Sequence, residues 1–240
     1  MNGRRRALAG LTAALCSMIS GHALAATGPS CAIPRDVRPA RAVPPPAREV
    51  SRGAPVASYM LSLTWSPEWC RSHANAADAR IQCRDNRFGF VVHGLWPNGG
   101  GKTHPRYCGP APALSPATVR ANLCMTPSPE LLQHEWAAHG SCGWNAPEPY
   151  FAKAAELWRG INAPPLVFPV GAAITVGDVR SAFAARNPQL KRNALFVKVG
   201  DGNRLQEIRV CYDLRFRPAA CTGGVGAPDH VRIRIQPIRP

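Results

Sequence analysis

The cysteines constrain the fold of this 240-residue chain more than any other feature of its sequence. Eight of them follow the N-terminal region: Cys31, Cys70, Cys83, Cys108, Cys124, Cys142, Cys211 and Cys221. An even number of cysteines in an exported chain indicates disulfides. Short separations favour Cys70–Cys83 and Cys211–Cys221, subject to the Cα distances that a disulfide requires. Metal binding is the alternative, but the chain contains no C-x-x-C pair.

Residues 1–25 have the features of a secretory signal peptide. Residues 4–6 are arginines, an apolar run follows, and residues 23–25 read Ala-Leu-Ala, which predicts cleavage after Ala25. A membrane anchor is the alternative, but the apolar run is shorter than the roughly 20 residues that a spanning helix needs. A lipoprotein signal ending at Cys16 is disfavoured by the bulky Leu15 before it. We therefore expect a periplasmic or secreted protein without stable membrane association.

The charge of the chain indicates a polyanionic partner. The formal net charge is +15, and it falls to about +12 when the three arginines of the predicted signal peptide are removed. Lysines and arginines bind phosphates with release of counterions, so nucleic acid is a natural partner. Non-specific binding to acidic surfaces is the alternative, because the arginines are scattered along the chain.

The order of predicted elements indicates an α+β fold. Residues 26–57 are rich in proline, alanine and arginine, and we expect an exposed, poorly ordered leader there, which Cys31 ties to the domain formed by residues 58–240. Composition and periodicity predict strands at 58–67, 88–96, 194–200, 204–213 and 231–235, and helices at 115–123, 128–140, 147–161 and 175–188. Helices gathered between strands predict a central antiparallel β-sheet with flanking helices, stabilised by disulfides.

The stretch "HEWAAHGSC" at residues 134–142 looks like the zinc-protease motif H-E-x-x-H. Zinc ligation from one helix requires histidines four positions apart, but His134 and His139 are five apart, which leaves their side chains roughly 140° apart on a helix. Glu135 and His139 are four apart and share a face. This spacing favours acid–base chemistry over a metal site. A partly exposed surface helix that carries histidines is the alternative.

The stretch "FVVHGLWPN" at residues 90–98 places His93 near the end of an apolar strand. Trp96 then leads into a glycine-rich loop, where an indole is a natural platform for stacking a nucleobase. The alternative is a core tryptophan beside a buried, hydrogen-bonded histidine.

Together, "FVVHGLWPN" and "HEWAAHGSC" closely resemble the two active-site segments of the ribonuclease T2 family of transferase-type endoribonucleases. "LTWSPEWC" and "EIRVCYD" look like further landmarks of the family, and the resemblance runs from about Ser58 to the C-terminus. It implies the α+β fold of the family, an RNA substrate, and a reaction that needs neither metal nor cofactor. We expect a monomer.

The resemblance also implies a role for each residue of the two motifs. His139 would be the general base that deprotonates the 2′-hydroxyl, and His93 the general acid that protonates the leaving 5′-oxygen. His134 would bind the phosphate, and Glu135 would orient His139. The products would be a 2′,3′-cyclic phosphate and a 5′-hydroxyl, with DNA excluded because it lacks the nucleophile.

The same resemblance places base recognition next to the first motif. Trp96 matches a family position that stacks on the base, and Asn98 falls where a polar residue contacts the edge of the base. His104 and Tyr107 would add a second stacking face, and residues 125–130 lie where the family has part of a second base pocket. We expect low base specificity.

One position departs from the family pattern. A lysine commonly stands immediately before the last histidine of the second motif, and this chain has Ala138 there. A lysine would place a cation against the phosphorane. Without it, stabilisation of the transition state falls to His134, to backbone groups, or to a basic residue from elsewhere, with Lys102, Arg106 and Lys153 as candidates. The alternative is a catalytically weakened, RNA-binding relative of the family.

Overall fold

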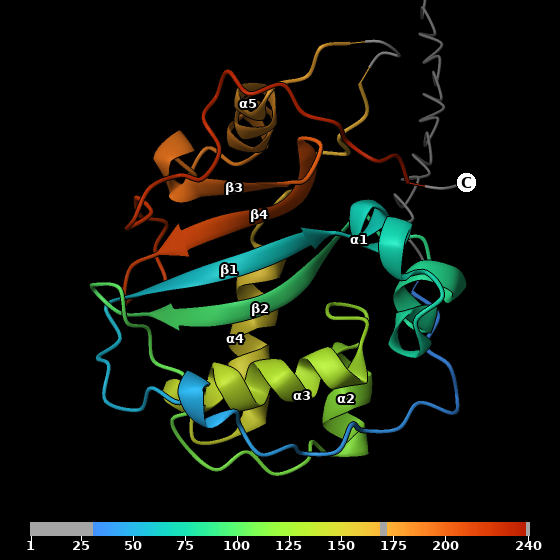
Figure 1. Cartoon of the computed structure of the whole chain (residues 1–240), viewed down its shortest axis with the longest axis vertical. Helices are drawn as coiled ribbons and strands as arrows, with labels where there is room; N and C mark the ends of the chain where they lie inside the picture. Colours follow the sequence, from blue (N-terminus) through green and yellow to red (C-terminus); the bar gives the residue numbers. More distant parts are fainter. Residues whose placement is uncertain (1–30, 169–171, 239–240) are drawn as a thin grey trace, which may run out of the picture.

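An antiparallel sheet of four strands in the order β2-β1-β4-β3 forms the centre of the molecule (Figure 1). The computed structural model describes residues 31–168 and 172–238, so the predicted signal peptide lies outside the described residues. The strands are β1 (Ser58–Trp65), β2 (Phe90–Asn98), β3 (Leu195–Gly200) and β4 (Arg204–Tyr212). The predicted α+β class, with an antiparallel sheet, flanking helices and disulfides, is confirmed.

Helices surround this sheet. They are α1 (Ser66–His73), α2 (Pro116–Asn122), α3 (Pro129–Ala138), α4 (Pro147–Arg159) and α5 (Val176–Arg186), with short helical turns η1 (Ala47–Glu49), η2 (Ala77–Ala79), η3 (Ile81–Asp85), η4 (Gly140–Cys142) and η5 (Arg192–Ala194). Figure 1 shows α4 crossing one face of the sheet, α3 beyond the β2 edge and α5 beyond the β3 edge. Within residues 31–168 and 172–238, no helix is both long and apolar enough to cross a bilayer.

The start of α3 follows directly from its sequence. Ser128 is the N-cap and accepts a hydrogen bond from the backbone N–H of Leu131, and Pro129 occupies the first helical position. The helix ends at Ala138, earlier than the predicted boundary at residue 140, and His139 follows with φ −124° and ψ −48°. The direction of the His139 side chain therefore does not follow from its spacing along the helix.

The core lies between the sheet and the helices that cover it. Leu61, Leu95 and Val197 from the strands are fully buried, as is Phe183 from α5. Tyr150 on α4 is also buried, and its hydroxyl accepts a hydrogen bond of 3.2 Å from the backbone N–H of Leu95 on β2. This contact fixes β2, the strand that carries His93, against α4.

Four disulfides join the described residues: Cys31–Cys124, Cys70–Cys83, Cys108–Cys142 and Cys211–Cys221. Both pairs favoured by short separation are formed. The two longer ones could not be chosen from spacing, because each connects segments that only the tertiary fold brings together.

Residues 31–57 differ from the poorly ordered leader that composition predicts. Cys31 is bonded to Cys124, and the side chain of Asn86 is hydrogen bonded to both the N–H and the C=O of Ala32. At the other end, Ser51 and Arg106 exchange two backbone hydrogen bonds of 3.0 Å. Proline-rich composition signals the lack of regular structure here, but these cross-links keep the segment against the domain.

One predicted strand ends earlier than expected, and another does not form. The predicted strand 58–67 ends at Trp65, because Ser66 and Pro67 begin α1. Residues 231–235 form only isolated bridges, one from Arg232 and one from Arg234. Their backbone bonds go to two different segments, near residues 174 and 204, so a continuous ladder does not form.

Candidate active site

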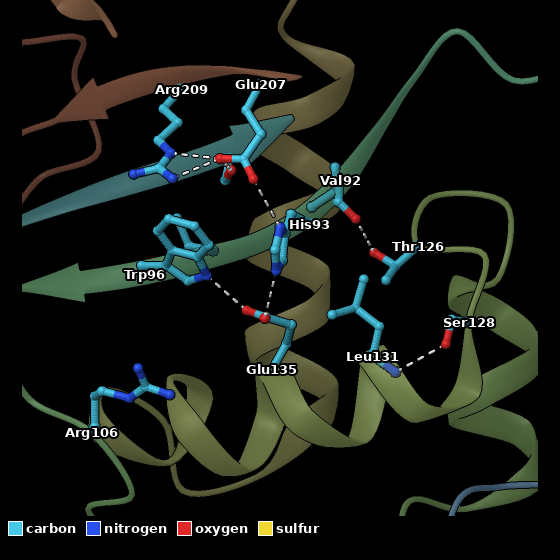
Figure 2. A network of polar contacts seen from close by, with 12 residues as sticks. Val92, His93, Trp96, Arg106, Thr126, Ser128, Leu131, Glu135, Glu207 and Arg209 are labelled. Carbon is cyan, nitrogen blue, oxygen red and sulfur yellow. Dashed lines mark hydrogen bonds and ion pairs between the residues drawn. The ribbon is translucent and has the colours of Figure 1, made fainter. Parts of the chain in front are cut away.

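His93 lies between two carboxylates from different elements. Its Nδ1 atom is 3.5 Å from Oε1 of Glu207 on β4, and its Nε2 atom is 3.5 Å from Oε1 of Glu135 on α3. Figure 2 shows the imidazole standing between them. Burial acts to lower the pKa of His93, but the hydrogen bond to Glu207 and the charges of both carboxylates outweigh it and raise the pKa. His93 therefore keeps its proton to a higher pH than an ordinary histidine.

A β-bulge presents this histidine. Ser62 of β1 pairs with Gly94 of β2, and the next residue, Leu63, pairs with Val92, so His93 has no partner across the strand pair. An extra residue of this kind bends the strand locally and redirects a side chain. The bulge was not visible in the sequence, because the apolar run through residues 88–96 reads as a regular strand.

Glu207 is held by several donors on the same side of the sheet. Nε of Arg209 donates to its Oε2 atom at 2.8 Å, the Ser62 hydroxyl donates at 3.3 Å, and Nζ of Lys198 lies 3.4 Å from Oε1. Burial raises the pKa of Glu207, but the hydrogen bond with His93 and the Arg209 charge lower it to about 2. Sequence reasoning identified this strand as a landmark and missed Glu207, although a carboxylate within the predicted strand 204–213 was the available signal.

Glu135 is almost completely buried, with 1% of its surface exposed. Nε1 of Trp96 donates to its Oε2 atom at 2.8 Å. Burial raises the pKa of Glu135 to about 7, against the lowering effects of the His93 charge and the Trp96 hydrogen bond. Gly94 permits this approach, because a Cβ atom there would lie 1.8 Å from Oε2 of Glu135. The glycine after His93 is therefore required by the carboxylate.

The carboxylate of Glu135 contacts His93 and Trp96, whereas the sequence predicted that it would orient His139. Within the described part of the chain, Glu135 and His139 are joined by a hydrogen bond between backbone groups, from the N–H of His139 to the C=O of Glu135 at 3.0 Å. The physical reason is the helix end: the prediction assumed that residue 139 continued the helix. The carboxylate of Glu135 thus lies against the histidine of β2.

His139 has the opposite electrostatic setting from His93. Burial, together with the charges of Arg106, His134, His93 and His104, lowers the pKa of His139 well below 6.5. Its imidazole lies 5.5 Å from the Trp96 ring, centroid to centroid, and its Nδ1 atom is buried without a hydrogen-bond partner among the described residues. His139 is therefore neutral at neutral pH, with a ring nitrogen available to accept a proton.

His134 is the exposed member of the set. Neighbouring groups still remove part of the water around its ring, and this desolvation and the charge of Arg106 lower the pKa of His134. Its ring centroid lies 6.3 Å from those of His139 and Tyr107. Tyr107 itself is 7% exposed, and its backbone N–H donates to the C=O of Ala138 at 3.0 Å. Tyr107 is therefore a buried side chain beside His134.

The predicted exclusion of a shared metal ion needs correction. One donor atom each from His134, Glu135 and His139 lies within 4.8 Å of the others. The predicted angle of roughly 140° between the His134 and His139 side chains assumed that both residues are helical. This assumption is wrong, because α3 ends at Ala138. The three side chains could therefore approach one ion, although Oε2 of Glu135 is already engaged by Trp96.

Two cavities adjoin these histidines. One, of about 320 Å³, is lined by Trp96, Asn98, His104, Arg106, His139 and Arg209, among others. The other, of about 530 Å³, is lined by His93, His134, Glu207, residues of α1, and Ser128 and Glu130 at the start of α3. Asn98 and His104 thus lie beside Trp96 in the smaller cavity, and Tyr107 does not line it.

Comparison with known proteins identifies the family of this chain. A model of the ribonuclease T2 family matches residues 56–221. The chain belongs to the ribonuclease T2 family.

Individual relatives agree with this assignment. The chain is 34% identical over 180 residues to a probable ribonuclease of Haemophilus influenzae, covering 70% of this chain and 62% of that protein, less than two thirds of its length. Trichomaglin, described as an S-like ribonuclease, has a similar fold, with a TM-score of 0.62, 19% identity, and coverage of 78% of this chain and 100% of that one. RNase NT in complex with 5′-AMP has a TM-score of 0.59, with 17% identity and coverage of 76% and 99%.

Proposed function

We propose that this protein is an exported endoribonuclease that cleaves single-stranded RNA by attack of the 2′-hydroxyl, with low base specificity. The observation that carries the proposal is the opposite tuning of two histidines, since the pKa of His93 is raised and that of His139 is lowered. Pairs of titratable groups pushed apart in this way are how one site holds an acid and a base at the same pH.

His139 acts as the general base and His93 as the general acid. The 2′-hydroxyl gives its proton to His139 while its oxygen forms a bond to phosphorus. The bond between phosphorus and the 5′-oxygen breaks, and His93 gives its proton to that oxygen. The products are a 2′,3′-cyclic phosphate and a 5′-hydroxyl, so atoms and protons balance without added water. The two histidines then exchange their protonation states with solvent before the next turnover.

The remaining residues of the site hold this pair in place. Glu135 and Glu207 stabilise the imidazolium of His93, and His134 binds the phosphate at the exposed side of the site. Trp96 stacks on the base, and Asn98 contacts its edge from the same cavity. The 5′-AMP in the structure of RNase NT supports a nucleotide as the ligand of this fold.

The disulfides and the N-terminal sequence indicate the compartment in which the protein acts. Four disulfides favour an oxidising compartment, which supports periplasmic or secreted localisation after removal of residues 1–25. Residues 58–240 act as the catalytic domain, in a protein that we expect to be monomeric.

The decisive experiment incubates the oxidised protein, lacking residues 1–25, with total RNA in excess EDTA, and identifies the product ends. We expect cleavage that leaves 2′,3′-cyclic phosphates and no cleavage of DNA. Loss of activity in EDTA and recovery with zinc would favour the second candidate, a metal hydrolase built on His134, Glu135 and His139, whose donor atoms lie within 4.8 Å. RNA binding without cleavage in either buffer would indicate a non-catalytic relative.

A further inference from the structure

Arg106 projects into the cavity that holds Trp96 and His139. Both Arg106 and His139 line this cavity of about 320 Å³. Figure 2 shows the guanidinium of Arg106 directed toward the side of the site where Trp96 and Glu135 lie. Its Nε atom is buried and has no hydrogen-bond partner among the described residues. The side chain thus brings a cation with an unused donor to the proposed reaction centre.

The backbone around Arg106 is fixed to the end of α3, where His139 follows. The N–H of Tyr107, the next residue, donates to the C=O of Ala138 at 3.0 Å. The disulfide Cys108–Cys142 joins the same loop to the turn after His139. Arg106 is therefore held in a constant position relative to the proposed base.

The leader holds Arg106 from the other side. Oε2 of Glu49 lies 3.0 Å from Nη2 of Arg106, and Ser51 exchanges two backbone hydrogen bonds with it. The ion pair with Glu49 is one-third exposed on both side chains, so water screens it. It orients the guanidinium and leaves much of its charge directed at the cavity.

The structure distinguishes Arg106 from the other cations near the site. Arg209 lines the same cavity, but it donates twice to Glu207 and lies over the Trp96 ring at 4.7 Å. Lys153 lies on α4 and is paired with Glu156 at 2.6 Å, outside both cavities. Among the charges that act on His139, that of Arg106 is the strongest, ahead of His134, His93 and His104.

We propose that Arg106 is a catalytic residue of this ribonuclease, and that its guanidinium binds a non-bridging oxygen of the phosphorane formed during 2′-hydroxyl attack. The inference rests on the proposed function. Negative charge gathers on these oxygens in the transition state, so a preorganised cation there accelerates the chemical step more than it strengthens substrate binding. Ala138 then marks no deficit, because the cation comes from a different loop.

The test compares Arg106→Gln, Arg106→Lys and wild type on a mixed-sequence oligoribonucleotide, across the pH range. Arg52→Gln is the matched control, because Arg52 binds the C=O of Tyr107 at 3.2 Å but does not line the cavity. We expect Arg106→Gln to lower kcat about tenfold to a hundredfold, somewhat less than removal of a fully buried oxyanion donor. Arg106→Lys should retain part of the rate, and Arg52→Gln nearly all of it.

Two further readouts separate a catalytic role from a structural one. Loss of the Arg106 charge should raise the pKa of His139 and move the acid limb of the kcat profile to higher pH. Affinity for the uncleavable 2′-deoxy oligonucleotide should change by no more than about threefold, since the contact forms mainly in the transition state. The charges of His134, His93 and His104 also act on His139, and they remain in the variant.

Wild type and His139→Ala are measured in parallel. If wild type cleaves RNA and His139→Ala does not, but folded Arg106→Gln keeps its rate and its acid limb, the assignment of Arg106 is overturned while the proposed function stands. If wild type does not cleave RNA, the proposed function itself fails. A rate loss matched by an equal loss of affinity for the deoxy oligonucleotide would make Arg106 a binding residue only and would also overturn the proposal.

Discussion

Nδ1 of His93 lies 3.5 Å from Oε1 of Glu207, and this carboxylate stands outside both sequence motifs. His93 lies on β2 and Glu207 on β4, and β1 separates the two strands. The histidine reaches across β1 because the bulge at His93 changes the direction of its side chain. The pKa of Glu207 is lowered to about 2, so this carboxylate is a constant negative charge beside the proposed acid. The protonation of His93 is thus controlled from across the sheet.

Replacing Glu207 with glutamine should therefore shift the pH dependence of the reaction. The hydrogen bond and charge of Glu207 raise the pKa of His93, so their loss lowers it. His93 must be protonated to act as an acid, and the alkaline limb of the kcat profile should move to lower pH. Glu156→Gln, an exposed change on α4, is the control. An alkaline limb that stays in place in folded Glu207→Gln would show that His93 is not the acid.

The three histidines should differ in their contributions. His93→Ala and His139→Ala should each lower kcat by at least about a hundredfold, the usual scale for a general acid or base. His134→Ala should lose less and should raise KM, because the exposed imidazole contacts the phosphate in the ground state as well. Near-normal turnover of His93→Ala would refute its assignment.

Trp96 has two functions that different substitutions separate. Trp96→Ala removes the stacking surface and should weaken binding of the 2′-deoxy oligonucleotide by roughly 1–3 kcal/mol. Trp96→Phe keeps an aromatic ring but loses the 2.8 Å hydrogen bond to Glu135. It should retain most of the affinity and raise the pKa of Glu135 further, because this hydrogen bond favours the carboxylate. Equal affinities of wild type and folded Trp96→Ala would make Trp96 purely structural.

Glu135→Gln should be more stable than wild type at pH 8 and less active. Burial raises the pKa of Glu135 in the folded state to about 7, from 4.5, so ionisation of the buried carboxylate opposes folding. This cost is absent below pH 4.5, grows as the pH rises to 7, and reaches on the order of 3 kcal/mol above it. Thermal unfolding of both proteins between pH 4 and pH 8 measures the difference. A gap that does not widen with pH would contradict the burial effect.

Ala138→Lys should lower stability and should not raise kcat. The family commonly has a lysine at this position, but Ala138 is fully buried, and a lysine there overpacks the region at a cost of about 1–3 kcal/mol. A single Ala138→Lys variant with higher kcat and unchanged stability would show that room for a cation already exists there.

Local sequence patterns predicted the strand and the helix that carry the site, but not the contacts between side chains from different elements. The strand with His93 and the start of α3 at Ser128 and Pro129 follow from apolar runs and capping residues, which are local properties. The contact of His93 with Glu207 depends on strand order, which periodicity does not specify.

The end of α3 shows a second limit of sequence reasoning. Gly140 suggested a helix through residue 140, but its role is close packing, since a Cβ atom there would lie 2.5 Å from the Trp136 ring. The helix ends two residues earlier, at Ala138, so the side chain of His139 does not have the direction that helical spacing predicts. The sequence named Arg106 as one of three candidate cations but could not select it, because its partners Glu49 and Ser51 belong to a segment whose composition indicates disorder.

The Cys31–Cys124 disulfide also imposes an order in time on the maturation of the protein. Cys31 precedes Cys124 by 93 residues, so a chain that emerges N-terminus first presents Cys31 before its partner. During this interval Cys70, Cys83 and Cys108 become available as wrong partners. The segment that carries Glu49 is thus secured late, and thiol–disulfide exchange has to select its partner. The yield of active protein should therefore depend on a catalyst of disulfide exchange where the chain folds.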